Sequence, residues 1–395
     1  MNRSERATGR PKRVAMLFEN NGYPQDVRVR SEAESLVRAG HHVTVVAPRR
    51  KGQSRHEEVA GVQVRRFRAP IEGGSIGGLL AEYVIANVTL HIAGLRQLLL
   101  GADVLHLYNP PDTFFPLGAI ARLLGRNVVW DHRDLFPELV EVKFGQTRWA
   151  TAARICERAS FAVASLVVSP NESYAEIATG RGHKRAAEVI VVRNGPPAAW
   201  LERTAPLREG KLDDPHLLYV GEIATQDGVE ALAEVVALLT HEHGLAGARL
   251  TIVGDGPALP LVEARLRKAG VADRVTVTGW VTPDQVPELI ATADICVDPA
   301  PATDLNDRST MTKVAEYLAV GRPTVAFDLL ETRRTAGETA LYARPGDTAD
   351  LAALVAALAG DPDRRTSLAA KARERAQSLT WEHSEAALVA AYEAM

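Results

Sequence analysis

Short apolar runs alternate with helix-like segments along the 395-residue chain. This alternation constrains the fold most, because consecutive parallel strands need long crossover connections, which are usually helices. Strands are predicted at 13–18, 42–47, 104–107, 127–131, 166–169 and 189–192, then at 217–220, 250–253, 275–278, 295–297 and 324–327. Helices are predicted at 27–39, 226–239, 258–268, 283–292 and 312–319. The pattern predicts an α/β protein with two doubly wound parallel sheets, each in a Rossmann-like domain.

A segment rich in Pro, Gly and charged residues separates the two halves, and the chain is too long for a single core. We predict a first domain at 12–195, a linker at 196–215 and a second domain at 216–381. From its position, a final helix at about 382–395 is expected to pack back onto the first domain. Residues 1–11 are basic and polar and are predicted to form a disordered leader.

Composition excludes several classes of protein. The net charge of −3 gives no basic bias for bulk nucleic-acid binding. Cys156 and Cys296 lie far apart, which suggests neither a disulfide framework nor a metal site. The apolar stretch 76–100 is interrupted by Glu82, Asn87, His91 and Arg96, so it is predicted to be a long, partly buried helix rather than a membrane span. We expect a cytoplasmic protein; an apolar surplus on that helix facing a hydrophobic acceptor or a bilayer remains an open alternative.

The segment 307–323 predicts a helix that holds a charged ligand at its first turn. Ser309 and Thr310 are candidate N-caps, and Gly321 with Pro323 ends the helix. Lys313 and Glu316 share one face near the helix start, where free N–H groups favour phosphate. A carboxylate at Glu316 suits a pair of ribose hydroxyls. The alternative is an ordinary surface helix.

Polar loops follow several predicted strands, where ligands of open α/β sheets bind. Gly22 could let the backbone approach a ligand, and Asp26 is a plausible N-cap. Arg28 and Arg30 could reach a phosphate or an acid; the alternative is that they are ordinary surface arginines in a first helical turn. Asp131, His132, Arg133 and Asp134 follow another strand, which favours a site over a histidine that only caps a helix.

The second half repeats this arrangement. Gly221 and Gly228 flank a polar loop, Gly254 lies in another tight turn, and Trp280 follows a third strand, where it could stack on a base or simply pack. The chain has no G-x-x-x-x-G-K-[ST] phosphate loop, no Ser-His-Asp signature and no HExxH spacing. A nucleophilic hydrolase and a metalloenzyme are therefore poorly supported.

These motifs together resemble the family 4 glycosyltransferases, which have the GT-B fold. The resemblance spans about residues 12 to 380 and rests on Asp131-His132-x-Asp134, the Val-Gly-Asp-Gly-Pro run ending at Pro257, and Lys313-x-x-Glu316-Tyr-x-Ala-x-Gly-x-Pro323. It implies two Rossmann-like domains facing across a cleft. It also implies transfer of a sugar from a nucleoside diphosphate donor, most often a UDP- or GDP-sugar, with retention and without a metal or cofactor.

The resemblance also implies roles for individual residues. Glu316 should hold the ribose, and His132 should contact the donor sugar. Gly22 should lie under the diphosphate. The backbone near Trp280 and Val281 should meet the base. The expected catalytic set is His132, Asp134, Lys313 and Glu316, and the diphosphate should meet N–H groups of Ser309, Thr310, Met311 and Thr312.

The chain departs from the family pattern at two places. Arg308 occupies the position of the earlier glutamate of an E-x7-E pair, to which the family assigns a contact with a sugar hydroxyl, and it could instead help to bind the diphosphate. Glu222, Gln226 and Asp227 occupy a loop where many members carry an Arg and a Lys that bind phosphate. We therefore expect Lys313, and Arg308 as well, to carry more of the diphosphate charge. The sequence resembles a branch with a Ser-x-x-x-Lys-x-x-Glu-Tyr motif.

Two other functions stay open at this point. A GT-B sugar-nucleotide epimerase could use Asp131, His132 and Asp134 as acids and bases. A catalytically silent partner subunit would explain the lost cations. The acceptor could be a saccharide, a lipid-linked sugar or a small natural product, and the sequence does not determine the oligomeric state.

Overall fold

The computed structural model describes residues 10–19, 21–68, 76–145, 147–203 and 205–395. The described chain divides into two compact units, Met1–Arg193 with Ser384–Met395 and Asn194–His383. Residues 1–9 of the predicted leader lie outside the described ranges. No helix within those ranges is both long enough and apolar enough to cross a membrane.

The first unit contains an eight-stranded sheet with the order β3-β4-β2-β1-β5-β6-β7-β8. All neighbouring strands are parallel except β3 and β4, which are antiparallel. The strands are β1 (Arg13–Leu17), β2 (His42–Arg49), β3 (His56–Val59), β4 (Val62–Arg68), β5 (Val104–Tyr108), β6 (Asn127–Asp131), β7 (Leu166–Ser169) and β8 (Val189–Val191).

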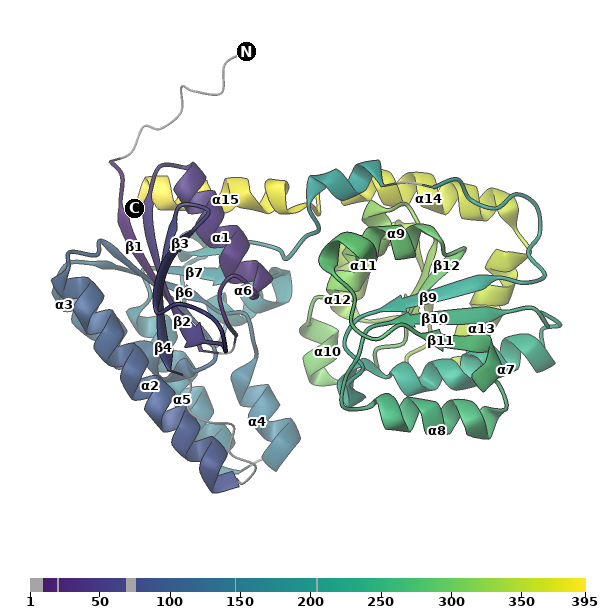
Figure 1. Cartoon of the computed structure of the whole chain (residues 1–395), viewed down its shortest axis with the longest axis horizontal. Coiled ribbons are helices and arrows are strands. Elements are labelled where there is room, and N and C mark those ends of the chain that lie inside the picture. Colours follow the sequence, from purple (N-terminus) through teal and green to yellow (C-terminus); the bar gives the residue numbers. More distant parts are fainter. Residues whose placement is uncertain (1–9, 20, 69–75, 146, 204) are drawn as a thin grey trace, which may run out of the picture. The chain divides into compact units, whose positions relative to one another are not determined.

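The helices of this unit cover both faces of its sheet (Figure 1). They are α1 (Val27–Arg38), α2 (Ile76–Leu99), α3 (Phe115–Leu123), α4 (Phe136–Phe144), α5 (Arg148–Val163) and α6 (Glu172–Thr179). Leu17 of β1 lies beside Gly94 of α2. On the opposite face, Tyr108 of β5 donates a hydrogen bond to Glu32 of α1. Because both faces are covered, the central strands are apolar runs rather than alternating ones.

The second unit has a six-stranded, all-parallel sheet with the order β11-β10-β9-β12-β13-β14. Its strands are β9 (His216–Val220), β10 (Arg249–Val253), β11 (Val275–Val277), β12 (Ile295–Asp298), β13 (Thr324–Phe327) and β14 (Ala340–Ala343). Its helices are α7 (Leu232–His241), α8 (Leu259–Ala269), α9 (Val286–Ala291), α10 (Asp304–Arg308), α11 (Thr312–Ala319), α12 (Leu330–Ala336), α13 (Thr348–Ala359) and α14 (Pro362–Ala376). The strand order reverses between β9 and β12, which makes this the switch point of a doubly wound fold.

Helix α15 (Trp381–Ala394) ends the chain, and its residues from Ser384 onward belong to the first unit. Tyr392 is fully buried there, and its hydroxyl lies 2.8 Å from Nδ1 of His106 on β5. Ser384 accepts a hydrogen bond from the backbone N–H of Arg193. The last helix therefore completes the layer that contains α1.

The prediction of two parallel α/β domains is confirmed. Strands β3, β4 and β14 were not predicted from the sequence. Strand β3 is the edge strand and β4 lies next to it. Because β4 alternates buried with more exposed residues, it lacks the continuous apolar run typical of a central parallel strand. Strand β14 has only four residues, Ala340–Ala343, and its alanines give a weak β signal.

Candidate functional site

Most predicted ligand-binding residues of the second unit lie at one edge of its sheet. The loop Gly221–Gly228 follows β9, and the segment that leads into α11 follows β12. Gly254 follows β10. These strands are adjacent, and β9 and β12 flank the switch point, where open α/β sheets bind ligands. The tertiary structure thus brings together loops that are far apart in sequence.

Backbone contacts hold these loops against one another. The N–H of Gly221 donates to the carbonyl of Val253, and the N–H of Ile223 donates to Asp255, both at 3.0 Å. Gly254 has a φ of +144° and pairs with Gly279. A Cβ at Gly254 would overlap the carbonyl of Gly221, so only glycine fits there. The observed role of Gly254 is close packing of the loops.

Lys313 projects from the first turn of α11 into this cluster and is 6% exposed. Its Nζ lies 3.2 Å from Oδ1 of Asp227 and 3.7 Å from Oδ1 of Asp298. It also lies 5.0 Å from the centre of the Tyr219 ring. Two carboxylates and an aromatic face therefore surround the cation.

The two ionisable groups at the centre affect each other. Burial opposes the charge on Lys313, but Asp298, Tyr219 and Asp227 outweigh burial, and the pKa of Lys313 is raised. Burial raises the pKa of Asp298, although Lys313 acts in the opposite direction. We expected Lys313 to be a cation available for diphosphate. Its ammonium group is instead already paired within the described chain. A phosphate would therefore either replace Asp227 as the partner of Lys313 or contact Lys313 together with Asp227.

The start of α11 differs from the prediction. Its N-cap is Met311, which makes no side-chain capping bond, so the assignment of Ser309 and Thr310 as N-caps is wrong. The reason is the additional helix α10, which Thr303 caps and Ser309 ends. The hydroxyl of Ser309 donates to the carbonyl of Leu305, one turn back in α10.

Glu316 lies one turn after Lys313 and is partly exposed. Burial raises its pKa to about 7, and Lys313 acts against this rise. Within the described ranges, its carboxyl group makes no hydrogen bond or ion pair. Its oxygen atoms are therefore available to hydroxyl donors, as the sequence predicted for a ribose site.

Several predicted donor-binding residues lie on the surface around this cluster. Trp280 is 75% exposed and Val281 is partly exposed. The side chains of Glu222, Gln226 and Arg308 are exposed as well. An indole ring at this exposure is available for stacking on a planar ligand.

Three residues of the cluster were not predicted from the sequence. Asn306 is buried, and its Nδ2 donates to the carbonyls of Gln226 and Pro301, which joins the loops after β9 and β12. Asp298 and Tyr219 surround Lys313 as described above. An aspartate that ends an apolar strand, as Asp298 does, is the one signal that could have identified a member of this set.

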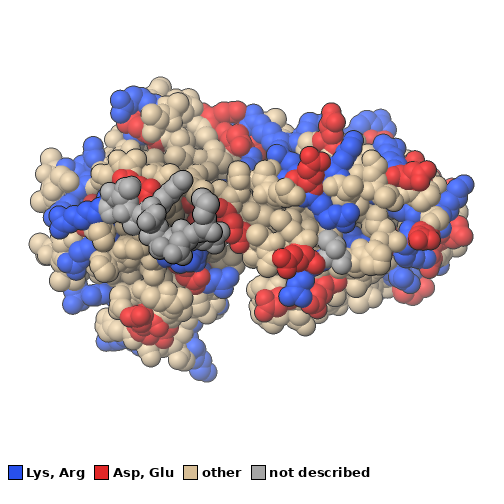
Figure 2. Space-filling view, turned by 90° about the horizontal axis from the view of Figure 1, so that it is seen from above, with Lys and Arg blue, Asp and Glu red and all other residues tan. Residues whose placement is uncertain are grey.

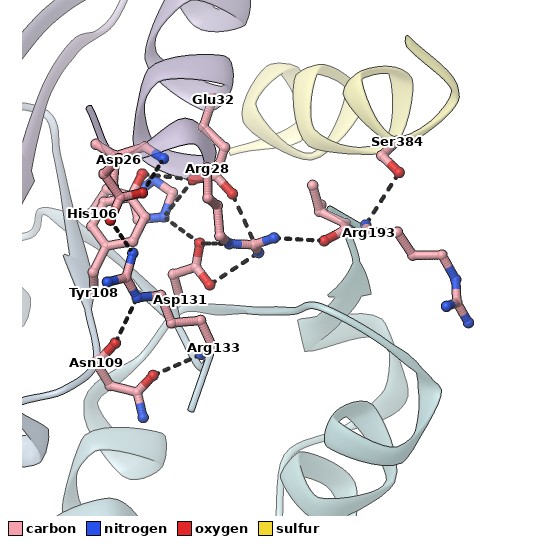
Figure 3. A network of polar contacts seen from close by, with 12 residues as sticks. Asp26, Arg28, Glu32, His106, Tyr108, Asn109, Asp131, Arg133, Arg193 and Ser384 are labelled. Carbon is pink, nitrogen blue, oxygen red and sulfur yellow. Dashed lines mark hydrogen bonds and ion pairs between the residues drawn. The ribbon is translucent and has the colours of Figure 1, made fainter. Parts of the chain in front are cut away.

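In the first unit, Arg28 does not face a ligand. It is buried, and its guanidinium donates to both carboxylate oxygens of Asp131 at 2.9 and 3.0 Å and to the carbonyl of Val192. Its NH2 atom lies 3.3 Å from Glu32. Figure 3 shows this network between α1, β5, β6 and the start of α15. The hypothesis that Arg28 reaches a phosphate is therefore wrong, because tertiary packing turns it inward.

Glu32, His106 and Asp131 place three potential metal-ligating atoms within 4.8 Å of one another. The guanidinium of Arg28 contacts both carboxylates, and burial raises the pKa of Glu32 well above its usual range. Burial lowers the pKa of His106, whereas Asp131 acts in the opposite direction. The donor set therefore suits a structural ion-pair network better than a metal.

His132 is also inside the first unit and is 0% exposed. Its ring lies about 5 Å from the rings of Trp130, Phe161 and Tyr174, and its Nε2 lies 3.4 Å from Glu157. In this conformation it cannot touch a ligand directly. The prediction that it contacts the donor sugar therefore has no geometric support in the described structure. Successive side chains at the end of β6 point to opposite faces of the sheet, and the side chain of His132 lies on the face that Phe161 of α5 and Tyr174 of α6 cover.

Its neighbours Arg133 and Asp134 are nearer the surface. The side chain of Asp134 is 40% exposed, and its backbone N–H donates to Oδ1 of Asn109. Burial raises the pKa of Asp134, and Arg133 acts against this rise. Arg133 pairs with Asp26 at 2.9 Å, and Asp26 also caps α1 as predicted.

Gly22 lies in the loop after β1 and is buried. A Cβ there would lie 2.9 Å from Oε1 of Gln25 and 3.2 Å from Cδ of Arg50. The exposed Arg50 is therefore a cation beside Gly22 that sequence reasoning missed.

Each half of the chain matches a family model. Residues 25–195 match the model described as glycosyl transferase 4-like domain, and residues 214–361 match the model described as glycosyl transferases group 1. Among curated proteins, the chain is 34% identical over 174 residues to the alpha-D-kanosaminyltransferase of Streptomyces kanamyceticus, which covers 43% of each protein. It is 30% identical over 152 residues to the 2-deoxystreptamine glucosyltransferase of the same organism, over 38% of this chain and 37% of the relative. The matched segment thus spans less than half the length of these relatives.

Solved structures share the fold over nearly the whole chain. The sucrose-phosphate synthase of Thermosynechococcus elongatus superposes with a TM-score of 0.73 and 19% identity, over 95% of this chain and 96% of that one. Anabaena Alr3699/HepE, solved in complex with UDP, superposes with a TM-score of 0.70 and 15% identity, over 97% and 100%. At these identities the likeness establishes the fold alone.

Proposed function

The chain belongs by both of its halves to the family 4 glycosyltransferases of the GT-B fold, and from this premise we propose that it transfers a glycosyl group from a nucleoside diphosphate sugar to an acceptor hydroxyl. One observation carries the proposal: Lys313 and Glu316 lie one turn apart at the start of α11, beside the switch point of the second sheet. A cation and a carboxyl group at this spacing match a diphosphate followed by a ribose.

The diphosphate is proposed to bind at the N-terminus of α11. The N–H groups near Ser309, Thr310, Met311 and Thr312 lie where a helix dipole favours an anion. Lys313 adds a cation, and its contact with Asp227 is the one a phosphate would weaken, because Asp227 is on a loop with 18% of its side chain exposed. Asp298 is 1% exposed and stays beside Lys313.

Glu316 is proposed to accept hydrogen bonds from the ribose hydroxyls. Trp280 and Val281 are proposed to meet the base, since Trp280 offers an exposed ring. Glu222, Gln226, Gly254 and Arg308 are proposed to line the donor site. Arg308 is exposed, and a guanidinium there would add charge for the diphosphate.

We further propose that transfer proceeds with retention and without a metal. Charge develops on the departing diphosphate oxygen, and preorganised N–H donors with Lys313 would stabilise it. The acceptor hydroxyl would attack on the same face, so no protein nucleophile is needed. A UDP- or GDP-sugar is the proposed donor.

From the first unit, Gly22 and Asp134 are kept as proposed donor contacts. Asp134 is partly exposed, and its raised pKa suits a group that exchanges a proton with a hydroxyl. His132 is proposed to hold this loop in place from below, through its aromatic contacts and Glu157, rather than to touch the sugar.

The glycosyltransferase relatives favour transfer over sugar-nucleotide epimerisation and over a silent subunit. The names of two of them refer to an aminosugar and to 2-deoxystreptamine. We therefore propose a small polyhydroxylated amine, such as an aminocyclitol, as the first acceptor class to test.

Titration calorimetry with UDP, GDP, ADP and dTDP tests the donor site without knowledge of the acceptor. One nucleotide is expected to bind, and Glu316→Ala should weaken it at least thirtyfold, since two hydrogen bonds to a charged group contribute about 1.5–3 kcal/mol each. Glu263→Ala, an exposed change on α8, is the matched control. Unchanged affinity in Glu316→Ala would overturn the proposed site.

A further inference from the structure

One outer face of the first unit carries an unusual number of exposed apolar side chains. Helix α2 leaves Val84, Ile85, Val88, Ile92, Leu95 and Leu99 between 37% and 87% exposed. Their spacing of three and four residues places them on one stripe of the helix. The opposite stripe is buried, with Ala86 at 2%, Leu90 at 0% and Leu98 at 6%. The prediction of a partly buried helix is confirmed, but its apolar surplus faces outward.

The stripe continues onto two neighbouring helices. Helix α3 adds Ile120 and Leu123, with Leu124 directly after it, and α5 adds Trp149 and Ile155, each at least 39% exposed. These helices pack closely through glycines: Gly94 of α2 lies against Leu117 of α3, and a Cβ on Gly118 would lie 2.8 Å from Val163 of α5. The three helices therefore form one layer, and we call its outward side the apolar–arginine face.

The charge on this face has one sign. Four exposed arginines lie on it: Arg96 on α2, Arg122 on α3, and Arg148 and Arg158 on α5. In the ranges that the structure describes, none of the four forms an ion pair; Arg122 donates to the hydroxyl of Ser165. A fifth, Arg154, pairs with Glu141 of α4.

Acidic side chains are missing from the outward side of the described parts of these helices. From Val84 onward α2 contains no Asp or Glu, and neither does α3. The one acid of α5, Glu157, is 0% exposed and pairs with His132 and Arg181 inside the unit. By contrast, Figure 2 shows basic and acidic side chains interspersed over the face that it displays. On a chain with a net charge of −3, a face whose charged side chains are all basic is not expected from a random distribution of charges.

We propose that the apolar–arginine face docks onto an anionic lipid bilayer. Apolar side chains with an aromatic residue enter the headgroup region, and arginines around them attract anionic headgroups. The same face is poorly suited to a second copy of this chain, because a two-fold contact would bring the four arginines of each copy together. The proposal is independent of the sugar-transfer reaction.

Co-sedimentation of the full chain with vesicles tests the proposal. We expect binding to phosphatidylcholine vesicles that contain 30% phosphatidylglycerol to be at least tenfold tighter than to pure phosphatidylcholine, and to weaken in high salt. Two double variants, Ile92→Ser with Leu99→Ser and Arg122→Glu with Arg158→Glu, should each reduce binding at least tenfold. Leu261→Ser with Arg265→Glu, on exposed positions of α8, should bind as the unchanged chain does.

The contrary outcomes are equally definite. Equal binding to both vesicle types, or none to either, would overturn the proposal. A concentration-dependent dimer in analytical ultracentrifugation that the same two variants abolish would assign the face to a second copy instead. Circular dichroism and nucleotide affinity of the variants verify that the fold is intact, so loss of vesicle binding can be read as loss of the surface.

Discussion

The ammonium of Lys313 lies 3.2 Å from a carboxylate oxygen of Asp227, although 86 residues separate them in the sequence. The contact joins the loop after β9 to the first turn of α11, at the switch point of the second sheet. A diphosphate that binds there meets a cation that already has a partner. Nucleotide binding is therefore expected to involve an exchange of partners.

Asp227→Asn should strengthen nucleoside diphosphate binding. The change removes the carboxylate that competes for Lys313 but keeps the size of the side chain, so we expect a three- to tenfold lower Kd in titration calorimetry. Asp255→Asn, on the neighbouring exposed loop, is the control and should change little. Weaker binding in Asp227→Asn would mean that Asp227 itself contacts the ligand.

Lys313→Ala should weaken the same nucleotide at least tenfold, because a charge-assisted contact to phosphate contributes about 1.5–3 kcal/mol. The protein should remain folded, since Asp298 already has a raised pKa and can take up a proton when its partner is lost. Lys268→Ala, at an exposed position of α8, is the control. Near-normal affinity in Lys313→Ala would place the phosphate elsewhere.

The pH dependence of stability should report Glu316. Its pKa rises from an ordinary 4.5 to about 7 on folding. The folded state therefore holds the proton more tightly than the unfolded state. The contribution of Glu316 to the free energy of unfolding is therefore fully present below pH 4.5. It falls by on the order of 2–3 kcal/mol as the pH rises to 7. Glu316→Gln should thus raise the Tm of the second unit more at pH 8 than at pH 5. An identical Tm shift at both pH values would contradict the raised pKa.

Activity should survive removal of divalent cations. If Lys313 and the start of α11 stabilise the leaving diphosphate, donor turnover measured with and without EDTA should agree within about twofold. The assay detects release of the nucleoside diphosphate from each candidate donor sugar. A strict requirement for added Mg²⁺ would contradict the proposed mechanism, and Asp227 with Asp298 would then be the first ligands to test.

Arg28→Met should destabilise the first unit by about 3–5 kcal/mol, because it leaves Asp131 and Glu32 buried without their cation. Arg38→Met, on the same helix, removes a surface pair with Glu385 and should cost about 1 kcal/mol or less. Urea unfolding followed by tryptophan fluorescence measures both. Equal losses would mean that the buried network contributes no more than an exposed pair.

The sequence predicted the fold well because both sheets are parallel and covered on both faces. Strands such as β5 and β12 are buried at every position, so each is a short apolar run that is recognisable without its neighbours. Strand β3 is the edge strand and β4 lies next to it. Both carry more exposed side chains at alternate positions, so neither is a continuous apolar run, and they were not predicted.

The candidate site was predicted less completely. Lys313 and Glu316 were identified because a helix places residues three apart on one face, which is a local property. Arg28 and His132 were assigned wrongly to the surface. Whether a side chain at the end of a strand or the start of a helix is buried depends on which other segments of the fold cover it. Asp298 and Asn306 were missed for the same reason.

The sequence by itself determined the two α/β halves, the helix with Lys313 and Glu316, and the absence of the motifs of a phosphate-loop enzyme or metalloprotease. These depend on periodicity and spacing within a few residues. Only the tertiary structure decided that Asp227 and Asp298 neutralise Lys313, that Arg28 and His132 turn inward, and that α2, α3 and α5 expose one apolar–arginine face. Each of these depends on contacts between segments that are distant in sequence, and burial there sets both the charge and the direction of a side chain.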